Sequence, residues 1–184
     1  KRICINCEQI SYLGKDYPIV KDDYKRIFST QTSYQMTSIL EGVVKRGTAK
    51  KLRDLELNIA GKTGTTNKNT DTWFIGYTSK LLIGVYVGLD NPSPLGRYET
   101  GSKTALPIFK EFVKKTINKS DSRPFKAAEG TVMMVVDPNT GQKAKFNSKN
   151  TIIEVYKKQN VIEGKVLYSN NDRLDTNNIL KFYW

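Results

Sequence analysis

The chain has 184 residues, of which 38% are hydrophobic, and it carries a formal net charge of +12 without a single histidine. This apolar content suffices for one compact domain with a core, with or without a small appendage. The absence of histidine excludes Ser-His and Cys-His nucleophile pairs and histidine-based zinc sites. The lysines are scattered rather than grouped, so we expect no nucleic-acid partner.

The leading segment, residues 1–24, shows no clear hydrophobic period, which predicts irregular chain or short strands. It contains the two cysteines of the sequence, Cys4 and Cys7. Two cysteines without histidine cannot close a four-ligand zinc site, so a short disulfide or two free thiols remain open. The chain begins at Lys1 rather than Met, and its longest apolar run, 81–89, is too short to cross a bilayer. We therefore expect a soluble piece of a longer protein.

A helix follows this segment. Between residues 32 and 45 apolar side chains recur at three- and four-residue steps, which is typical of an amphipathic helix. Ser29 or Thr30 can cap its start, and Gly47 is expected to end it. The basic stretch 48–57 predicts a loop with a helical turn.

Three strands and a second helix come next. Residues 58–64, 72–78 and 82–89 are rich in β-forming side chains, and a short turn joins the last two runs. A broad apolar face predicts a helix over 102–117, with Pro107 in its first turn. The order predicts an α+β fold in which an antiparallel sheet packs against helices, both of which can cover one face.

The sequence changes character beyond residue 120. Residues 130–136 and 143–146, separated by a Pro-Asn-Thr-Gly turn, predict a second hairpin, and 152–156 predict a short strand or helix. We divide the chain into a leading segment, the main domain and a small β-rich tail: 1–24, 25–120 and 121–184.

The segment that carries chemistry is the K-T-G motif, which begins at Lys62. A sheet-edge strand offers unpaired N–H groups to a guest peptide. Lys62 adds positive charge, Gly64 allows close approach, and the hydroxyls of Thr63 and Thr65 can bind a carboxylate. A backbone N–H just past the glycine can face the oxyanion of an acyl-transfer intermediate. K-T-G is a known element of penicillin-binding proteins and serine β-lactamases.

The context of this motif narrows the choice. Five segments stand in order over roughly residues 26–113: Gln35-Met-Thr-Ser-Ile-Leu-Glu-Gly-Val-Val-Lys-Arg-Gly-Thr, Gly61-Lys-Thr-Gly-Thr-Thr, Asp71-Thr-Trp-Phe-Ile-Gly-Tyr-Thr, Val85-Tyr-Val-Gly-Leu-Asp and Glu99-Thr-Gly-Ser-Lys-Thr-Ala-Leu-Pro-Ile-Phe. The chain thereby resembles the C-terminal part of the transpeptidase domain of class A penicillin-binding proteins.

The resemblance implies a five-stranded antiparallel sheet between helices, of which this chain holds the K-T-G strand, the next two strands and the last helix. It also implies a nucleophilic serine in an S-x-x-K motif, and no serine here has a lysine three residues on. Ser148-Lys-Asn and Ser169-Asn-Asn match the family's S-x-N by letter, but they follow the K-T-G instead of preceding it. We treat both as coincidence.

The resemblance further implies cross-linking of peptidoglycan by D,D-transpeptidation, without a cofactor or metal. Lys62, Thr63 and Gly64 would be the catalytic residues, and Thr63, Thr65 and Thr66 would bind substrate. The Thr65 N–H would complete the oxyanion hole. Implied partners are stem peptides, β-lactams and the missing N-terminal half, with a homodimer through the exposed sheet edge as a further expectation. The implied location is the periplasmic face of the bacterial inner membrane, in a parent that also carries a glycosyltransferase.

Other features are given plainer interpretations. We interpret Trp73, Phe74 and Tyr77 as sheet packing, with substrate stacking as the alternative. Thr100-Gly101-Ser102 resembles a loop near the family's active-site cleft, which allows it a supporting role. A basic cluster is interpreted as solvated charge, with attraction to anionic wall polymer as the alternative: Arg46, Lys50, Lys51 and Arg53. Two other functions stay open, namely a β-lactamase or carboxypeptidase and a non-catalytic wall-binding module. Because the serine is missing, we predict that this chain alone is inactive.

Overall fold

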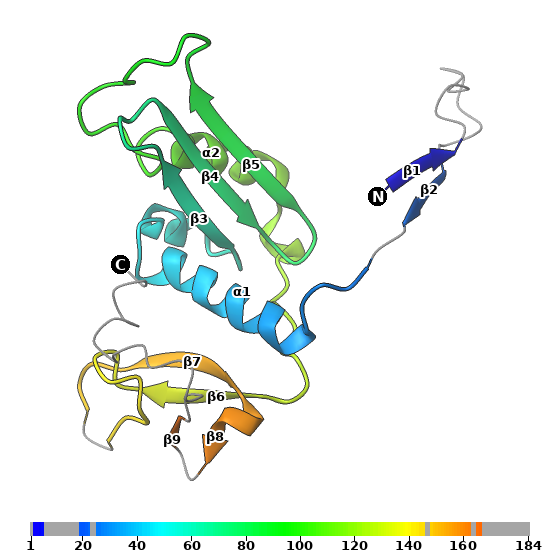
Figure 1. Cartoon of the computed structure of the whole chain (residues 1–184), viewed down its shortest axis with the longest axis vertical. Helices are drawn as coiled ribbons and strands as arrows, with labels where there is room; N and C mark the ends of the chain where they lie inside the picture. Colours follow the sequence, from blue (N-terminus) through cyan, green and yellow to red (C-terminus); the bar gives the residue numbers. More distant parts are fainter. Residues whose placement is uncertain (1, 6–18, 23–24, 146–147, 163–164, 167–184) are drawn as a thin grey trace.

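The computed structural model describes residues 2–5, 19–22, 25–145, 148–162 and 165–166 (Figure 1). Its elements, in chain order, are β1 (Arg2–Ile5), β2 (Ile19–Asp22), α1 (Thr30–Lys45), the 3₁₀ helix η2 (Lys50–Leu55), β3 (Ala60–Thr65), β4 (Asp71–Tyr77), β5 (Leu82–Gly88), α2 (Ala105–Thr116), the 3₁₀ helix η3 (Lys119–Asp121), β6 (Thr131–Val136), β7 (Ile152–Lys157), the 3₁₀ helix η4 (Lys158–Asn160), β8 (Val161–Ile162) and β9 (Lys165–Val166).

The leading segment contains short strands, as the sequence allowed. β1 pairs antiparallel with β2, with Arg2 opposite Asp22. Cys4 belongs to β1, whereas Cys7 lies outside the described residues, so the state of the two cysteines stays a prediction.

Helix α1 begins and ends where its sequence signals predict. The Ser29 hydroxyl accepts a hydrogen bond from the Thr32 N–H at 3.2 Å, which caps the start of the helix. At the other end the Gly47 N–H donates to the carbonyls of Gly42 and Val43. A Cβ on Gly47 would lie 2.9 Å from the Val43 Cα, so a glycine is needed where the chain turns back on the helix.

The three predicted strands form one antiparallel sheet in the order β3-β4-β5, which confirms this part of the prediction. Helix α2 covers the face from which Phe74 points, and Pro107 lies in its first turn. The rings of Phe74 and Phe109 meet edge to face with centroids 4.7 Å apart. Gly76 leaves room for this pair, because a Cβ there would lie 2.6 Å from the Phe109 ring.

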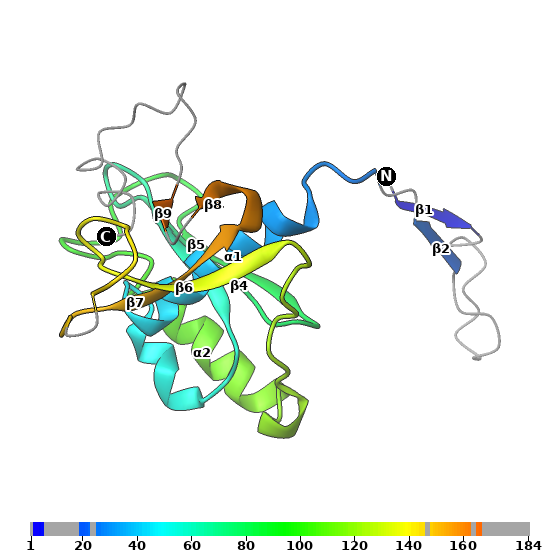
Figure 2. The same ribbon diagram turned by 90° about the horizontal axis from the view of Figure 1, so that it is seen from below.

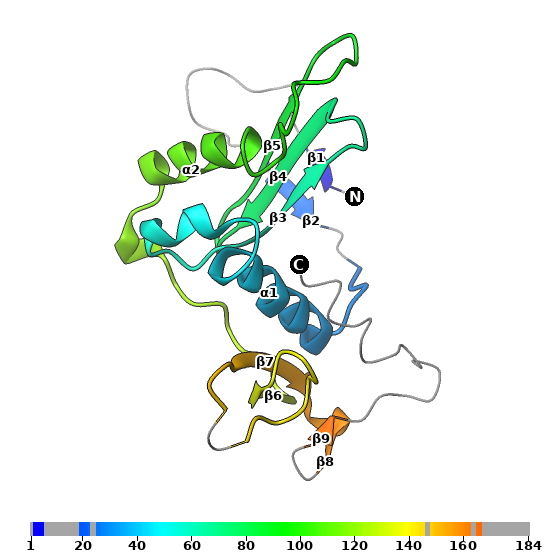
Figure 3. The same ribbon diagram turned by 90° about the vertical axis from the view of Figure 1, so that its left-hand side faces the viewer.

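The expectation that both helices cover one face is correct only for α2. Helix α1 lies along β3, the edge strand, and not over the sheet (Figure 3). Its Thr37 hydroxyl lies 3.0 Å from the Tyr77 hydroxyl, which points away from α2 because side chains alternate along β4. Of α1, only the last turn joins the core under α2, through Val44 and the partly buried Val43. The apolar stripe of a helix shows that one side is buried, but it does not show which part of the sheet that side contacts.

The predicted tail hairpin has a different second strand. β6 pairs over its whole length with β7, whereas residues 143–145, the described part of the predicted strand, contribute a single bridge between Val136 and Lys143. Strand length and composition explain this pairing. β7 offers six residues that match the six of β6, whereas 143–146 is a short segment of which half is lysine. The β6–β7 hairpin packs against α1 on the side away from the sheet (Figures 1 and 2).

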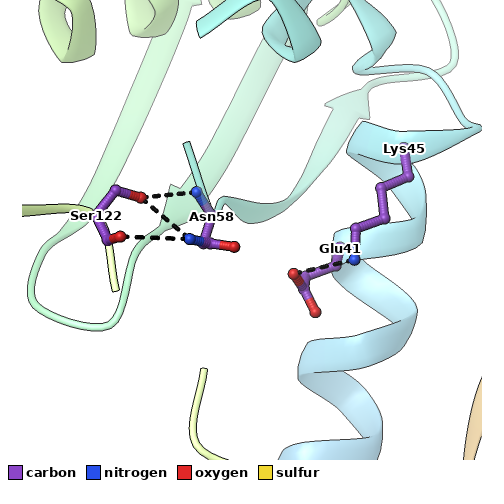
Figure 4. Close-up of polar contacts among 4 residues, drawn as sticks. All are labelled: Glu41, Lys45, Asn58 and Ser122. Atoms are coloured by element: carbon purple, nitrogen blue, oxygen red, sulfur yellow. Dashed lines mark hydrogen bonds and ion pairs between the residues drawn. The ribbon is translucent and has the colours of Figure 1, made fainter. Parts of the chain in front are cut away.

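The chain between α2 and the tail is tied to the start of the K-T-G strand. The Asn58 N–H donates to the Ser122 hydroxyl at 2.8 Å, and the Asn58 side-chain amide reaches the same residue (Figure 4). Three residues on, the Phe125 ring meets the Tyr77 ring edge to face at 5.6 Å. These contacts fix the path by which the tail returns to α1.

No described helix is both long and apolar enough to cross a membrane.

Candidate active site

The K-T-G motif lies on β3, whose second edge pairs with no described strand. In the register of β3 and β4, Lys62 stands opposite Ile75, and Thr63 stands opposite Phe74. Lys62 and Gly64 therefore face away from α2, whereas Thr63 and Thr65 share the α2 side. Lys62 is exposed, so its charge is available at the surface of this edge strand.

Every second residue of β3 directs its backbone N–H and C=O groups toward the open edge of the sheet. The Thr66 N–H donates to the Asp71 carbonyl at 3.0 Å, which makes these two a hydrogen-bonded pair of the antiparallel ladder. Such pairs alternate with pairs whose N–H and C=O groups point away from the partner strand. Thr65 and Thr63 lie one and three residues before Thr66, so both direct their N–H and C=O groups away from β4, toward the open edge.

The side chain of Lys62 bends toward Thr63, the next residue of the motif. Its Nζ donates to the Thr63 carbonyl at 2.9 Å and lies 3.4 Å from the Thr63 hydroxyl. The ammonium group therefore lies beside the outward edge of the strand, next to a threonine hydroxyl. A positive charge and a hydroxyl donor side by side form a suitable place for a carboxylate.

Both threonine hydroxyls are held by segments distant in sequence. The Thr63 Oγ1 lies 3.1 Å from the Thr48 Oγ1, in the turn after α1. The Thr65 Oγ1 accepts a hydrogen bond from the Gly101 N–H at 3.1 Å, in the turn before α2. A hydroxyl that accepts from an N–H keeps its own proton for another partner. Thr65 is thus held as a donor, and its side chain is exposed.

Gly101 also packs flat on the motif. A Cβ built on it would lie 2.7 Å from the Gly64 carbonyl oxygen and 2.4 Å from that of Trp73. The same turn continues to Thr104, whose hydroxyl lies 2.6 Å from that of the buried Thr72. The turn at the start of α2 is therefore held in close contact with the end of β3 that carries Thr65.

Thr66 has a different setting from the other two threonines. Its hydroxyl accepts from the N–H groups of Thr70 and Asp71 and so closes the β3–β4 turn. The Asp71 carboxylate in turn accepts from the Tyr86 hydroxyl at 2.7 Å, and this bond, with smaller contributions from burial and from nearby negative charge, raises the Tyr86 pKa. The substrate-binding role of Thr66 stays a prediction.

The remaining candidates divide between core and surface. Phe74 is fully buried, whereas Trp73 is 42% exposed and packs against Tyr86 with ring centroids 4.8 Å apart. The basic cluster is split: Arg46 turns to Glu154 of the tail, and its other members line a shallow hollow with Asp54 and Lys110. Among the residues that the structure describes, no three His, Cys, Asp or Glu side chains gather where a metal could be held.

The resemblance allowed a supporting role for the loop that contains Gly101, but sequence reasoning missed the role of Thr48 and the specific bond that Gly101 makes. Both belong to segments that carry the resemblance, but neither lies in a motif with recognised chemistry. Their partners are 15 and 36 residues away in the chain, so only the fold brings them to the motif.

The fold and this edge strand place the chain in a defined class. Residues 10–114 match the family model "Penicillin binding protein transpeptidase domain", and the chain belongs to that family. The family is one of acyl-transfer enzymes, and both the predicted family and the predicted α+β fold are confirmed.

The individual relatives point to one kind of member. The chain is 40% identical to penicillin-binding protein 1A of Rickettsia prowazekii (strain Madrid E) over 159 residues, 85% of this chain and 20% of that protein. It is 38% identical to penicillin-binding protein 1A of Pseudomonas aeruginosa over 136 residues, 73% of this chain and 16% of that protein. The crystal structure of penicillin-binding protein 1A from Haemophilus influenzae matches with a TM-score of 0.65 and 25% identity, over 78% of this chain and 22% of that one. The chain thus spans about a fifth of the length of these relatives.

Proposed function

We propose that this chain forms the K-T-G side of the active site of a peptidoglycan D,D-transpeptidase. The observation that carries the proposal is the arrangement on β3, where an exposed lysine, two positioned hydroxyls and outward N–H groups follow one open strand edge. An extended peptide that ends in a carboxylate fits such an edge by adding backbone hydrogen bonds to it. The acyl-D-alanyl-D-alanine end of a stem peptide has this form, and β-lactams imitate it.

The reaction we propose has two acyl transfers. A serine outside this chain attacks the carbonyl between the two D-alanines, an ester forms, and the C–N bond breaks as the leaving D-alanine takes a proton. An amine of a second stem peptide then attacks the ester. A new peptide bond forms, the amine loses a proton, and the serine hydroxyl is restored.

In this proposal each group of the motif has one task. The Lys62 ammonium attracts the substrate's terminal carboxylate, which accepts hydrogen bonds from the hydroxyls of Thr63 and Thr65. The outward N–H of Thr65 donates to the oxyanion that develops on the attacked carbonyl. Gly64 keeps the strand free of a side chain where the guest peptide lies.

We propose further that the rest of the domain covers the open face of the sheet. Four large side chains on that face are exposed: Trp73, Ile75, Leu82 and Tyr86. An apolar group of this kind is a surface for another part of the protein or another chain. The N-terminal half of the same protein is the proposed partner, and a homodimer through this region is the alternative. The proposed location of the assembled enzyme is the periplasmic face of the inner membrane.

The hydrolase and binding-module interpretations are less well supported than the transpeptidase. A β-lactamase shares the K-T-G strand, but the matched relatives are penicillin-binding proteins 1A over most of this chain. A purely binding module would not need two distant segments to hold both threonine hydroxyls of the motif.

Intact-mass spectrometry after incubation with a labelled penicillin tests the proposal. This chain alone should form no adduct, because it offers no serine paired with a lysine one helical turn away. A polypeptide that joins this chain to a serine-bearing N-terminal half should gain one penicillin per molecule. A stoichiometric adduct on this chain alone, or none on the joined polypeptide, would contradict the proposal.

A further inference from the structure

The tail of the chain has no part in the proposed chemistry, yet it is joined to α1 by several specific contacts. The Gln31 and Gln35 side-chain amides donate to the carbonyls of Glu129 and Val155, each at 3.0 Å. At the other end of the helix the Arg46 guanidinium pairs with the Glu154 carboxylate. The β6–β7 hairpin lies beside α1 (Figure 1), and the tail is therefore bonded to both ends of that helix.

The Arg46–Glu154 pair is largely shielded from solvent. The Glu154 side chain is 11% exposed and that of Arg46 is 29% exposed. A carboxylate this buried needs its partner, so the pair fixes the place of Arg46. Gly42 makes the geometry possible, because a Cβ there would lie 2.8 Å from the guanidinium carbon of Arg46.

Arg46 begins the turn that reaches the K-T-G strand. The turn is tied back to the helix, because the N–H groups of Gly47 and Ala49 both donate to the Val43 carbonyl at 3.1 Å. Ala49 is fully buried. Between them Thr48 extends its hydroxyl to that of Thr63. A turn held at both ends in this way leaves the Thr48 hydroxyl little freedom to move relative to Arg46.

We propose that Thr48 is a positioning residue for Thr63 of the K-T-G motif, and that the tail hairpin, through Glu154 and Arg46, holds the turn that carries Thr48. The inference rests on the proposed function, because Thr63 matters as a carboxylate-binding group. In this account the tail braces the active site from outside the transpeptidase sheet, and it does so without contacting substrate.

The first test uses this chain and needs no catalysis. Three-bond couplings from the Thr63 methyl carbon to the backbone nitrogen and carbonyl carbon report its side-chain rotamer by NMR. We expect one rotamer in the original chain and in Thr48→Ser, which keeps the hydroxyl. Thr48→Val, of the same shape without a hydroxyl, should give averaged couplings at an unchanged melting temperature. Unaveraged couplings in Thr48→Val would overturn the positioning role.

Glu154→Ala tests the part assigned to the tail. We expect the Thr63 couplings to move toward averaged values while the melting of the sheet and α2 stays in place. Couplings that remain those of the original chain would overturn the tail's role. Thr37→Val, which removes another hydroxyl of α1 that contacts the sheet, is the matched control and should leave the Thr63 couplings unchanged.

The second test uses the polypeptide that joins this chain to a serine-bearing half. Thr48→Val should lower the second-order rate constant of penicillin acylation by about 3- to 10-fold, through weaker binding before the chemical step. Thr48→Ser should restore it. An unchanged rate constant in Thr48→Val would count against the inference. If the joined polypeptide is not acylated at all, the proposed function fails, and the rotamer measurement still decides the positioning role.

Discussion

Two interfaces of this chain use opposite physical means. Between the sheet and α2, large apolar side chains interlock, and Phe74, Leu106, Phe109 and Val113 are fully buried. Between α1 and the tail hairpin, two glutamine amides and one ion pair carry the specific contacts, and the far side of the hairpin leaves Met133, Val135 and Ile153 exposed. Apolar burial resists changes of pH and salt, whereas a buried ion pair depends on the charge of both partners. The sheet and α2 should therefore form a stable unit, and the docking of the tail on α1 should depend on pH and salt.

The largest effect should come from the apolar interface. Phe109→Ala removes a ring that packs edge to face on Phe74, and it should lower the free energy of unfolding by about 3–5 kcal/mol. Phe112→Ala, on the same helix with 46% of its side chain exposed, should change it by about 0.5 kcal/mol. Chemical denaturation of the two variants checks this. Equal losses would show that α2 is not packed on the sheet as described.

A smaller, pH-dependent effect should come from the tail. Burial raises the pKa of the Glu154 carboxyl, and the charges of Arg46 and Lys45 oppose that rise. A carboxyl whose pKa is higher when docked binds its proton more tightly in the docked hairpin. Docking is then strongest below the ordinary pKa of glutamate and weakens as the pH rises through the raised value. Arg46→Ala removes an opposing charge, so it raises the pKa further and weakens docking near neutral pH by about 1–3 kcal/mol.

Hydrogen-exchange protection of the β7 amides measures this docking. In Arg46→Ala we expect protection at about pH 4 and its loss near pH 7, where the carboxyl is ionised. Arg46→Ala combined with Glu154→Gln should lose the pH dependence, because no ionisable group remains in the pair. Protection that rises with pH in Arg46→Ala would contradict the sign of this argument.

The same contrast explains which parts of the fold could be predicted from sequence. The sheet and α2 follow from local patterns, since β-forming runs, a short turn and an apolar stripe each show in a few residues. The partner of β6 could not be predicted in this way, because strand pairing depends on competition between segments. β7 is separated from β6 by a 15-residue connection, so no local pattern joins the two strands. The position of α1 beside β3 also depends on tertiary packing that a helical period does not specify.

The candidate site divides in a similar way. From the sequence, the K-T-G motif and its resemblance to the family identified β3 as the strand of the site. The strand register of the structure then placed the side chain of Lys62 on one face of the sheet and those of Thr63 and Thr65 on the other. The resemblance placed the loop of Gly101 near the cleft, but the bonds from Thr48 and Gly101 to the two threonines could not be predicted, because a hydroxyl in a turn and a backbone N–H give no signal of their distant partners. Arg46 shows the reverse case, since its neighbours in sequence suggested a surface cluster, while the fold partly buries its side chain against Glu154.

The most direct test of the central claim, that the K-T-G strand serves acyl transfer, is the rate of penicillin acylation in Lys62→Ala of the joined polypeptide. Lys62 is exposed and, among the described residues, its hydrogen bonds go to Thr63, so its loss should leave the melting temperature unchanged. We expect the second-order rate constant to fall by about 100-fold or more, which corresponds to lost electrostatic stabilisation of roughly 2.7 kcal/mol. Lys115→Ala, at the far end of α2, is the matched control and should react at the original rate. A Lys62→Ala variant that is acylated as fast as this control would contradict the account.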